Sequence, residues 1–237
     1  MNVLITGASS GLGLELSRRF FAMNNHVIST DPDPKCGPMF TTWDARNSNA
    51  SAELVSSMQS CRMARVDVLI NNAGINAIKK FEDLDQDFIT EIMQVNFVAP
   101  VLLTQALLKA GMFHVGTVVC NVISDAAWRP MRHSLAYNCS KAALDMATKQ
   151  MARELTKPYG LTIFGVRPGK MRGTGMSNYI DRSVCELRGW TSEEADAYFR
   201  TNSLTGIEFE PTAVAQFIYQ LCTTSMPISG ACIDLAG

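Results

Sequence analysis

Short apolar runs alternate with longer amphipathic segments from one end of this 237-residue chain to the other. Most of the runs are rich in valine and isoleucine, and strands are predicted over residues 2–6, 26–30, 40–44, 66–72, 116–123, 161–168 and 231–235. Most are apolar on both faces, which is typical of a sheet buried between helices. The predicted fold class is therefore α/β, a doubly wound parallel sheet of Rossmann type in three α/β/α layers.

Helical periodicity fills the intervals between the strands, over residues 12–23, 50–61, 85–110, 136–157 and 210–223. No linker, repeat or low-complexity tract interrupts the alternation, so residues 1–237 are expected to form one domain. Residues 173–209 depart from the pattern and are predicted to form a substrate-binding lid; we call them the lid segment. Thr191 followed by Glu194 is a capping-box pattern, which predicts a short helix within it.

Composition narrows the function classes. Hydrophobic residues make up 47% of the chain and its formal charge is -1, which allows a sizeable core but gives no field to attract nucleic acid or an anionic membrane. The first apolar run follows no basic segment, and no apolar stretch approaches the ~18 residues of a membrane span. The seven cysteines are scattered without C-x-x-C spacing, and the three histidines are far apart in sequence. We expect a reduced, cytoplasmic protein without a metal site.

The segment TGASSGLG, residues 6–13, directly follows a predicted strand and opens a predicted helix. Gly7, Gly11 and Gly13 allow a tight turn and a close approach of a pyrophosphate to the positive end of the helix. An ordinary strand-to-helix turn is the alternative interpretation.

Asp31 stands at the end of the second strand, eighteen positions after Gly13. In a dinucleotide-binding sheet, a carboxylate at this place accepts hydrogen bonds from the adenosine ribose and repels a 2′-phosphate. Because Pro32 follows rather than a basic residue, NAD is favoured over NADP. Alternatively, Asp31 and Pro32 simply begin a turn.

These motifs together resemble the short-chain dehydrogenase/reductase family along nearly the full chain. The matching positions, in order, are TGASSGLG (6–13), NNAG (71–74), Asn96, Ser124, the pair Tyr137 and Lys141, and Pro168-Gly169. Ser124 precedes Tyr137 by the thirteen positions familiar in that family.

The resemblance implies four catalytic residues. Tyr137 would be the general acid/base, and Lys141, one helical turn on, would lower the pKa of the phenol and bind the nicotinamide ribose. Ser124 would hydrogen-bond the substrate oxygen. Asn96 would anchor a water in a proton relay from Lys141.

The resemblance also implies a set of cofactor contacts and a facing substrate wall. The cofactor residues would be Gly7, Ser9, Ser10, Gly11, Leu12, Gly13, Asp31, Asp44, Ala45, Asn72, Ala73, Gly74, Tyr137, Lys141, Pro168, Gly169, Met171 and Thr174. Asp44 would contact adenine, although a place at the start of a helix is an equal alternative. Substrate contacts are expected from Asp125, Trp128, Met176 and Tyr179.

Three departures from the family pattern stand out. Prolines at 32, 34 and 38 predict that the helix usual between Asp31 and Asp44 is missing. Ile123 replaces a small residue before Ser124. In PGKMRGTGM, residues 168–176, Thr174 comes one position late and Met171 takes a position usually held by valine. The neighbouring Arg172 is compatible with an anionic substrate or with a solvated loop charge.

The leading hypothesis is an enzyme that transfers hydride between NAD(H) and a small alcohol or ketone. An NADP-dependent 3-oxoacyl reductase is the runner-up. A dinucleotide-binding sensor is a different class, but such proteins typically lose the tyrosine or the lysine. A nucleotide-sugar epimerase usually needs a larger C-terminal domain than the roughly seventy residues after Pro168. The resemblance also implies a homo-oligomer, a homotetramer or a dimer.

Overall fold

A computed structural model describes residues 1–32, 40–61, 65–203 and 205–235. Seven parallel strands form one sheet in the order β3-β2-β1-β4-β5-β6-β7. Their bounds are β1 (Asn2–Thr6), β2 (His26–Asp31), β3 (Phe40–Thr42), β4 (Val68–Asn71), β5 (Val118–Val122), β6 (Thr162–Pro168) and β7 (Cys232–Leu235). The strand order reverses between β1 and β4, so a crevice is expected at the carboxyl ends of these two strands.

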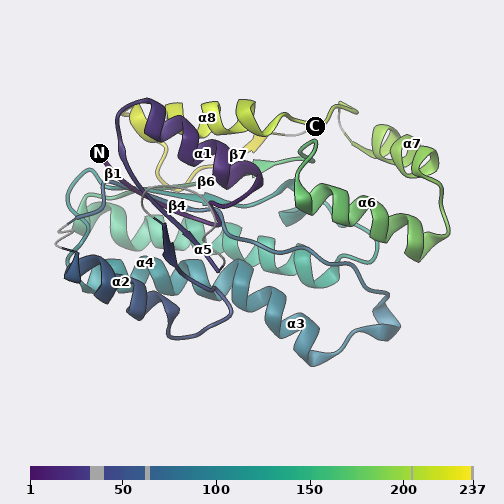
Figure 1. Ribbon diagram of the computed structural model, residues 1–237, viewed down its shortest axis with the longest axis horizontal. Coiled ribbons are helices and arrows are strands. Elements are labelled where there is room, and N and C mark those ends of the chain that lie inside the picture. Colours follow the sequence, from purple (N-terminus) through teal and green to yellow (C-terminus); the bar gives the residue numbers. More distant parts are fainter. Residues whose placement is uncertain (33–39, 62–64, 204, 236–237) are drawn as a thin grey trace.

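Helices cover both faces of the sheet and confirm the predicted three-layer α/β/α architecture (Figure 1). One layer contains α1 (Gly11–Ala22) and α8 (Pro211–Thr223). The opposite layer contains α2 (Ala50–Ser60), α4 (Ala99–Lys109) and α5 (Leu135–Tyr159), with α3 (Gln86–Met93) beside it. Two further helices, α6 (Gly175–Arg188) and α7 (Ser192–Asn202), stand at one end of the molecule.

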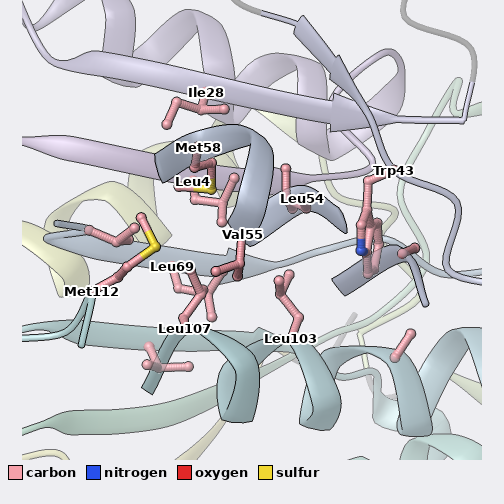
Figure 2. Packing of buried hydrophobic residues seen from close by; sticks show 14 of the residues in the cluster. Leu4, Ile28, Trp43, Leu54, Val55, Met58, Leu69, Leu103, Leu107 and Met112 are labelled. Carbon is pink, nitrogen blue, oxygen red and sulfur yellow. The ribbon is translucent and has the colours of Figure 1, made fainter. Parts of the chain in front are cut away.

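Alternate residues of β1 pack into two separate hydrophobic cores, one on each face of the sheet. Val3 and Ile5 of β1 belong to the cluster under α1 and α8, whereas Leu4 between them belongs to the cluster on the other face. Figure 2 shows the second cluster, where Leu54 of α2 and Leu103 of α4 pack beside Trp43. This period of two is the reason that the strands read as apolar on both faces.

The segment predicted as one helix over 85–110 is interrupted. A π-helical turn, η2 (Gln94–Val98), separates α3 from α4 and contains the buried Asn96. Single π turns inside α-helices are frequently found at functional sites.

The same stretch corrects a second expectation. Residues Gln86–Lys109 form a helical run of 24 residues whose length and hydropathy would suffice to cross a membrane. Leu103 and Leu107 of this run are fully buried in the core beside the sheet. Core helices of soluble proteins share this length and apolarity, so the run is weak evidence for a membrane.

The lid segment also differs from prediction, because it holds two helices rather than one. The predicted capping box of α7 is present, with Thr191 Oγ1 accepting from Glu194 N at 3.3 Å. Helix α6 was missed. Strand β3 ends two residues before the predicted position, and the prediction of a missing helix after Asp31 falls on residues 33–39, outside the described residues.

A buried polar chain crosses the sheet where the apolar core ends. Asn71 on β4 donates to Asn121 Oδ1 on β5 at 2.8 Å, and Asn121 Nδ2 donates to Thr148 Oγ1 on α5 at 2.8 Å. All three side chains are almost completely buried. Each group satisfies the next, so the chain fixes the carboxyl ends of β4 and β5 against α5.

We expect Asn121→Ala to lower the free energy of unfolding by about 1–3 kcal/mol in total. Asn71 Nδ2 then keeps only its bond to Thr104 Oγ1 at 3.3 Å, and Thr148 Oγ1 still donates to Leu144 O but loses the N–H that it accepts. Urea unfolding monitored by circular dichroism measures the change. Asn178→Ala is the matched control on the exposed surface of α6 and leaves the midpoint unchanged or slightly raised, since alanine favours a helix. Equal midpoints for the two variants would show that the buried hydrogen-bonded side chains contribute nothing to the free energy of unfolding.

Candidate active site

A cavity of about 560 Å³ lies at the carboxyl ends of the strands. Residues 6–13, with Gly7, Gly11 and Gly13, are called the glycine loop. The cavity lining runs from the glycine loop and the end of β2, past the loops after β4 and β5, to the lid segment. The predicted cofactor residues in the lining are Gly7, Ser10, Gly11, Leu12, Gly13, Asp31, Asp44, Ala45, Asn72, Ala73, Gly74, Tyr137, Lys141, Pro168, Gly169, Met171 and Thr174. Ser9 is outside the lining and contacts Asp31 instead.

The glycine loop is built too tightly for side chains. Gly7 has a φ of 66°, and a Cβ placed there would lie 2.8 Å from Ala73 Cα. A Cβ on Gly13 would lie 2.0 Å from the carbonyl oxygen of Gly7. Ser10, the N-cap of α1, makes no side-chain capping bond, and the first turn carries no acidic residue. The loop therefore presents a close backbone approach and an electropositive helix start, which fit a pyrophosphate.

The ends of β1 and β4 are joined by hydrogen bonds behind this loop. Thr6 Oγ1 accepts from the backbone N–H groups of Asn72 and Ala73, both at 3.0 Å. Asn72 Nδ2 donates to Thr6 O at 2.9 Å and to Gly7 O at 3.1 Å. The NNAG motif thus holds the glycine loop in place in addition to lining the cavity.

Asp31 closes the far end of the cavity. Its carboxylate accepts from Ser9 Oγ at 2.6 Å and from the Ser9 N–H at 3.4 Å, which ties β2 to the glycine loop. Trp43 and Asp44 lie at the same end; Asp44 Oδ1 accepts from Arg46 N at 2.9 Å. The indole Nε1 of Trp43 is buried and has no hydrogen-bond partner among the described residues.

Asn96 uses its π-helical position to join three elements. Its Oδ1 accepts from Ile75 N at 2.9 Å, and its Nδ2 donates to Ile75 O at 2.9 Å and to Ser140 Oγ on α5 at 3.0 Å. A Cβ on Gly74 would lie 3.2 Å from Asn96 Oδ1 and 3.4 Å from Lys141 Nζ. Asn96 is therefore beside the lysine, with Gly74 between them.

Ser124 and Tyr137 come together in the lining of the cavity. Ser124 follows β5 and caps the short helix η3 (Asp125–Ala127), while Tyr137 is in the first turn of α5 and is 6% exposed. Burial raises the pKa of Tyr137 to about 12; the Asp125 carboxylate also raises it, and a hydrogen bond with Ser124 lowers it.

The direction of that shift corrects the sequence-based expectation of a lowered phenol pKa. Lys141 Nζ donates to Val122 O at 3.0 Å and lies 5.9 Å from the centroid of the Tyr137 ring. Burial also lowers the pKa of Lys141, to about 8. Burial is therefore the largest cause of both pKa shifts.

The segment after β6 reaches the glycine loop despite its unusual spacing. Thr174 is buried, caps α6 through Ser177 N at 3.1 Å, and lies where a Cβ on Gly11 would meet its Cγ2 at 3.6 Å. Met171 forms an isolated bridge with Phe209. Arg172 is 64% exposed, pairs with Glu210 at 3.4 Å and does not line the cavity, which favours a solvated loop charge.

Of the predicted substrate residues, Asp125 and Met176 line the cavity, and Trp128 and Tyr179 do not. Trp128 Nε1 donates to Asp234 at 3.1 Å on β7. Sequence reasoning missed several lining residues, among them Trp43, Ile75, Asn76, Arg132, Lys170 and Arg188. Ile75 and Asn76 carried a usable signal, because they are the two residues directly after the NNAG motif.

The fold and the cavity define a Rossmann-type α/β protein whose site combines a glycine loop with a buried serine, tyrosine and lysine. Residues 1–184 match the family model described as short chain dehydrogenase. The chain therefore belongs to the short chain dehydrogenase family and is an oxidoreductase.

Three individual similarities accompany this match. Sorbitol-6-phosphate 2-dehydrogenase of Klebsiella pneumoniae is 25% identical over 99% of this chain and 94% of its own length. A ketoacyl reductase of a Nostoc species is 31% identical over 82% of this chain and 72% of its own. The solved structure of an actinorhodin polyketide ketoreductase variant with NADPH has a TM-score of 0.89 at 24% identity, covering 100% of this chain and 95% of that one.

The lowered pKa of Lys141 makes stability depend on pH. Between about pH 8 and the ordinary value of 10.5, the unfolded lysine holds a proton that the folded protein has released, so stability rises with pH. We expect the free energy of unfolding of the wild type, minus that of Lys141→Met, to rise by up to about 1.4 kcal/mol per pH unit in this window.

Urea unfolding across this pH range tests the expectation. Lys157→Met, at an exposed position of the same helix, is the control, and its difference from the wild type stays flat. A flat difference for Lys141→Met as well would contradict the lowered pKa.

Proposed function

We propose that this protein transfers hydride between NAD(H) and an alcohol or ketone, as a single domain with residues 173–209 as the substrate lid. The observation that carries the proposal is the convergence of Ser124, Tyr137 and Lys141 in the cavity that also contains the glycine loop. Family membership supports it independently.

The glycine loop would hold the pyrophosphate, and Asp31 the adenosine ribose. Asp44, Ala45 and the NNAG residues would line the adenosine half, and Thr174 would reach the cofactor beside Gly11. When bound, the nicotinamide supplies the hydride donor or acceptor. The tight loop and the uncapped start of α1 are the structural support for this assignment.

Tyr137 moves the proton. Because its pKa is about 12, the phenol is protonated near neutral pH and is ready to donate from Oη to a carbonyl oxygen during ketone reduction. In alcohol oxidation the same oxygen takes the proton back. Ser124 orients the substrate oxygen and stabilises its developing charge.

Lys141 and Asn96 support that transfer. An ammonium held at Val122 O remains beside the tyrosine ring and favours the phenolate electrostatically when the proton leaves. Asn96 keeps the NNAG loop against α5, and we assign it the relay to solvent on the strength of its place beside Lys141.

NAD is our proposed cofactor because the carboxylate of Asp31 lies at the adenosine end. An NADP-dependent ketoacyl reductase is the second candidate, favoured by the ketoacyl reductase relative and by the NADPH-bound ketoreductase of similar fold. The relatives named above differ in substrate, so substrate class does not follow from them.

We also propose a cytoplasmic homo-oligomer. Met146 on α5 is 63% exposed and Leu135 is 41% exposed, so the outer face of this long helix carries large apolar side chains that a second copy would cover. Six described cysteines are free, which is compatible with a reducing compartment.

Asp31→Ala tests the cofactor. We expect the wild type to bind NADH more tightly than NADPH, and the variant to lose about tenfold to a hundredfold in NADH affinity with little change for NADPH. Fluorescence titration measures both affinities. Asp87→Ala, at an exposed position on α3, is the matched control and should bind like the wild type. A wild-type preference for NADPH would favour the ketoacyl reductase candidate.

Tyr137→Phe tests the reaction. Turnover of the best compound in a panel of secondary alcohols, hydroxy acids and sugar alcohols should fall by about 10²–10⁴-fold, because proton transfer is lost. Binding of NADH should remain. Tyr159→Phe, which alters an exposed hydroxyl at the end of α5, should keep full turnover. Undiminished turnover in Tyr137→Phe would remove the tyrosine from the mechanism.

A further inference from the structure

Four basic side chains line the end of the cavity nearest the lid segment: Arg129, Arg132, Lys170 and Arg188. Two of them are neutralised by carboxylates. Arg129 pairs with Asp125 at 3.5 Å, and Lys170 pairs with Asp181 at 2.9 Å and with Glu208 at 2.7 Å.

Arg132 and Arg188 have no carboxylate within 4.0 Å among the residues that the structure describes. Arg132 lies five positions before Tyr137, and Arg188 is the last residue of α6. Arg188 donates to the carbonyl oxygen of Arg132 at 3.4 Å, so the two residues adjoin in the cavity lining. One acidic group near these arginines is Glu82, whose charge acts on the neighbouring His133. Glu82 is exposed and does not line the cavity.

The guanidinium of Arg188 is held in place by aromatic rings. Its Cζ lies 4.6 Å from the ring centroid of Trp190 and 4.9 Å from that of Tyr198, and these two rings pack on each other at 5.1 Å. Its Nε is buried and has no hydrogen-bond partner among the described residues. A position in the last turn of α6 accounts for a positive charge. It does not account for a fixed guanidinium with an unpaired buried donor at the cavity wall.

The backbone next to Arg132 is fixed as well. His133 has a φ of 68°, a left-handed conformation that is uncommon outside glycine, and its carbonyl oxygen accepts from Lys79 N at 2.9 Å. This turn lies between Arg132 and the start of α5, so the position of Arg132 relative to Tyr137 is set by the fold.

We propose that Arg188, assisted by Arg132, binds an anionic group of the substrate, a carboxylate or a phosphate. A planar guanidinium matches either oxyanion with two parallel hydrogen bonds, and stacking on two rings removes much of the entropy that it would otherwise lose on binding. The inference rests on the proposed function and deepens it: the substrate is an anionic hydroxy or oxo compound. By holding the anionic group, the two arginines would fix the position of the reacting carbon.

Paired probes with and without an anionic group test the proposal. We would compare sorbitol 6-phosphate with sorbitol, and 3-hydroxybutyrate with 3-hydroxybutyramide, using the wild type and Arg188→Gln. The charged member of at least one pair should have the lower KM in the wild type. Arg188→Gln should raise that KM about tenfold to a hundredfold, with kcat little changed and the neutral members unaffected.

Two further variants separate this role from a structural one. Arg188→Lys keeps the charge but not the fork, and should recover part of the lost affinity. Arg182→Gln changes an exposed arginine of the same helix that is outside the lining, and should behave as the wild type. The pair that responds distinguishes a phosphate from a carboxylate.

The inference is overturned if charged and neutral members have equal KM values in the wild type, or if the preference survives in Arg188→Gln. If the wild type turns over none of these four probes, the proposed function is judged by the wider panel used for Tyr137→Phe, and the anion site is judged by binding. Thermal unfolding with saturating NADH should then show stabilisation by sorbitol 6-phosphate or 3-hydroxybutyrate that Arg188→Gln abolishes. No stabilisation, or an equal one in the variant, overturns the inference.

Discussion

Three hydrogen bonds from one buried amide organise the reactive part of this molecule. Asn96 grips both backbone groups of Ile75 and reaches Ser140 on α5, and the hydroxyl of Ser140 donates in turn to Tyr137 O at 2.8 Å. The loop that carries the NNAG motif and the helix that carries the tyrosine are therefore held by a single side chain. The π turn points this amide inward, so the irregularity in the helix serves the geometry of the site.

The sequence predicted those features that depend on local pattern. The strands that are apolar on both faces, the glycine loop and the Thr191 capping box each depend on residues close together in sequence. Each of them was found in the structure. The π turn was out of reach because it depends on bonds from Asn96 to a loop twenty-one positions earlier. Helix α6 was missed because Gly175 opens it, its residues are polar on average and none of them is buried.

In the candidate site too, features set by local sequence were predicted and features set by tertiary packing were not. The positions of Tyr137 and Lys141 followed from their spacing, but the direction of the tyrosine pKa shift did not, because burial is a property of the packed fold. Arg188 had no signal in the sequence: only the tertiary structure brings it beside Arg132 and the two rings. Side chains contributed by the lid segment are therefore the part of the site that pattern reasoning reaches least.

The ammonium of Lys170 gives the lid segment one further property. Lys170 directly precedes Met171 at the exit of β6, and its two carboxylate partners lie on opposite flanks of the lid, Asp181 in α6 and Glu208 after α7. One cation thus ties both flanks of the lid segment to the exit of β6, and Arg172 adds a second cation 3.6 Å from Glu208. Lys170 and Glu208 are each only 20% exposed, so salt screens this pair less than it screens ion pairs on the open surface.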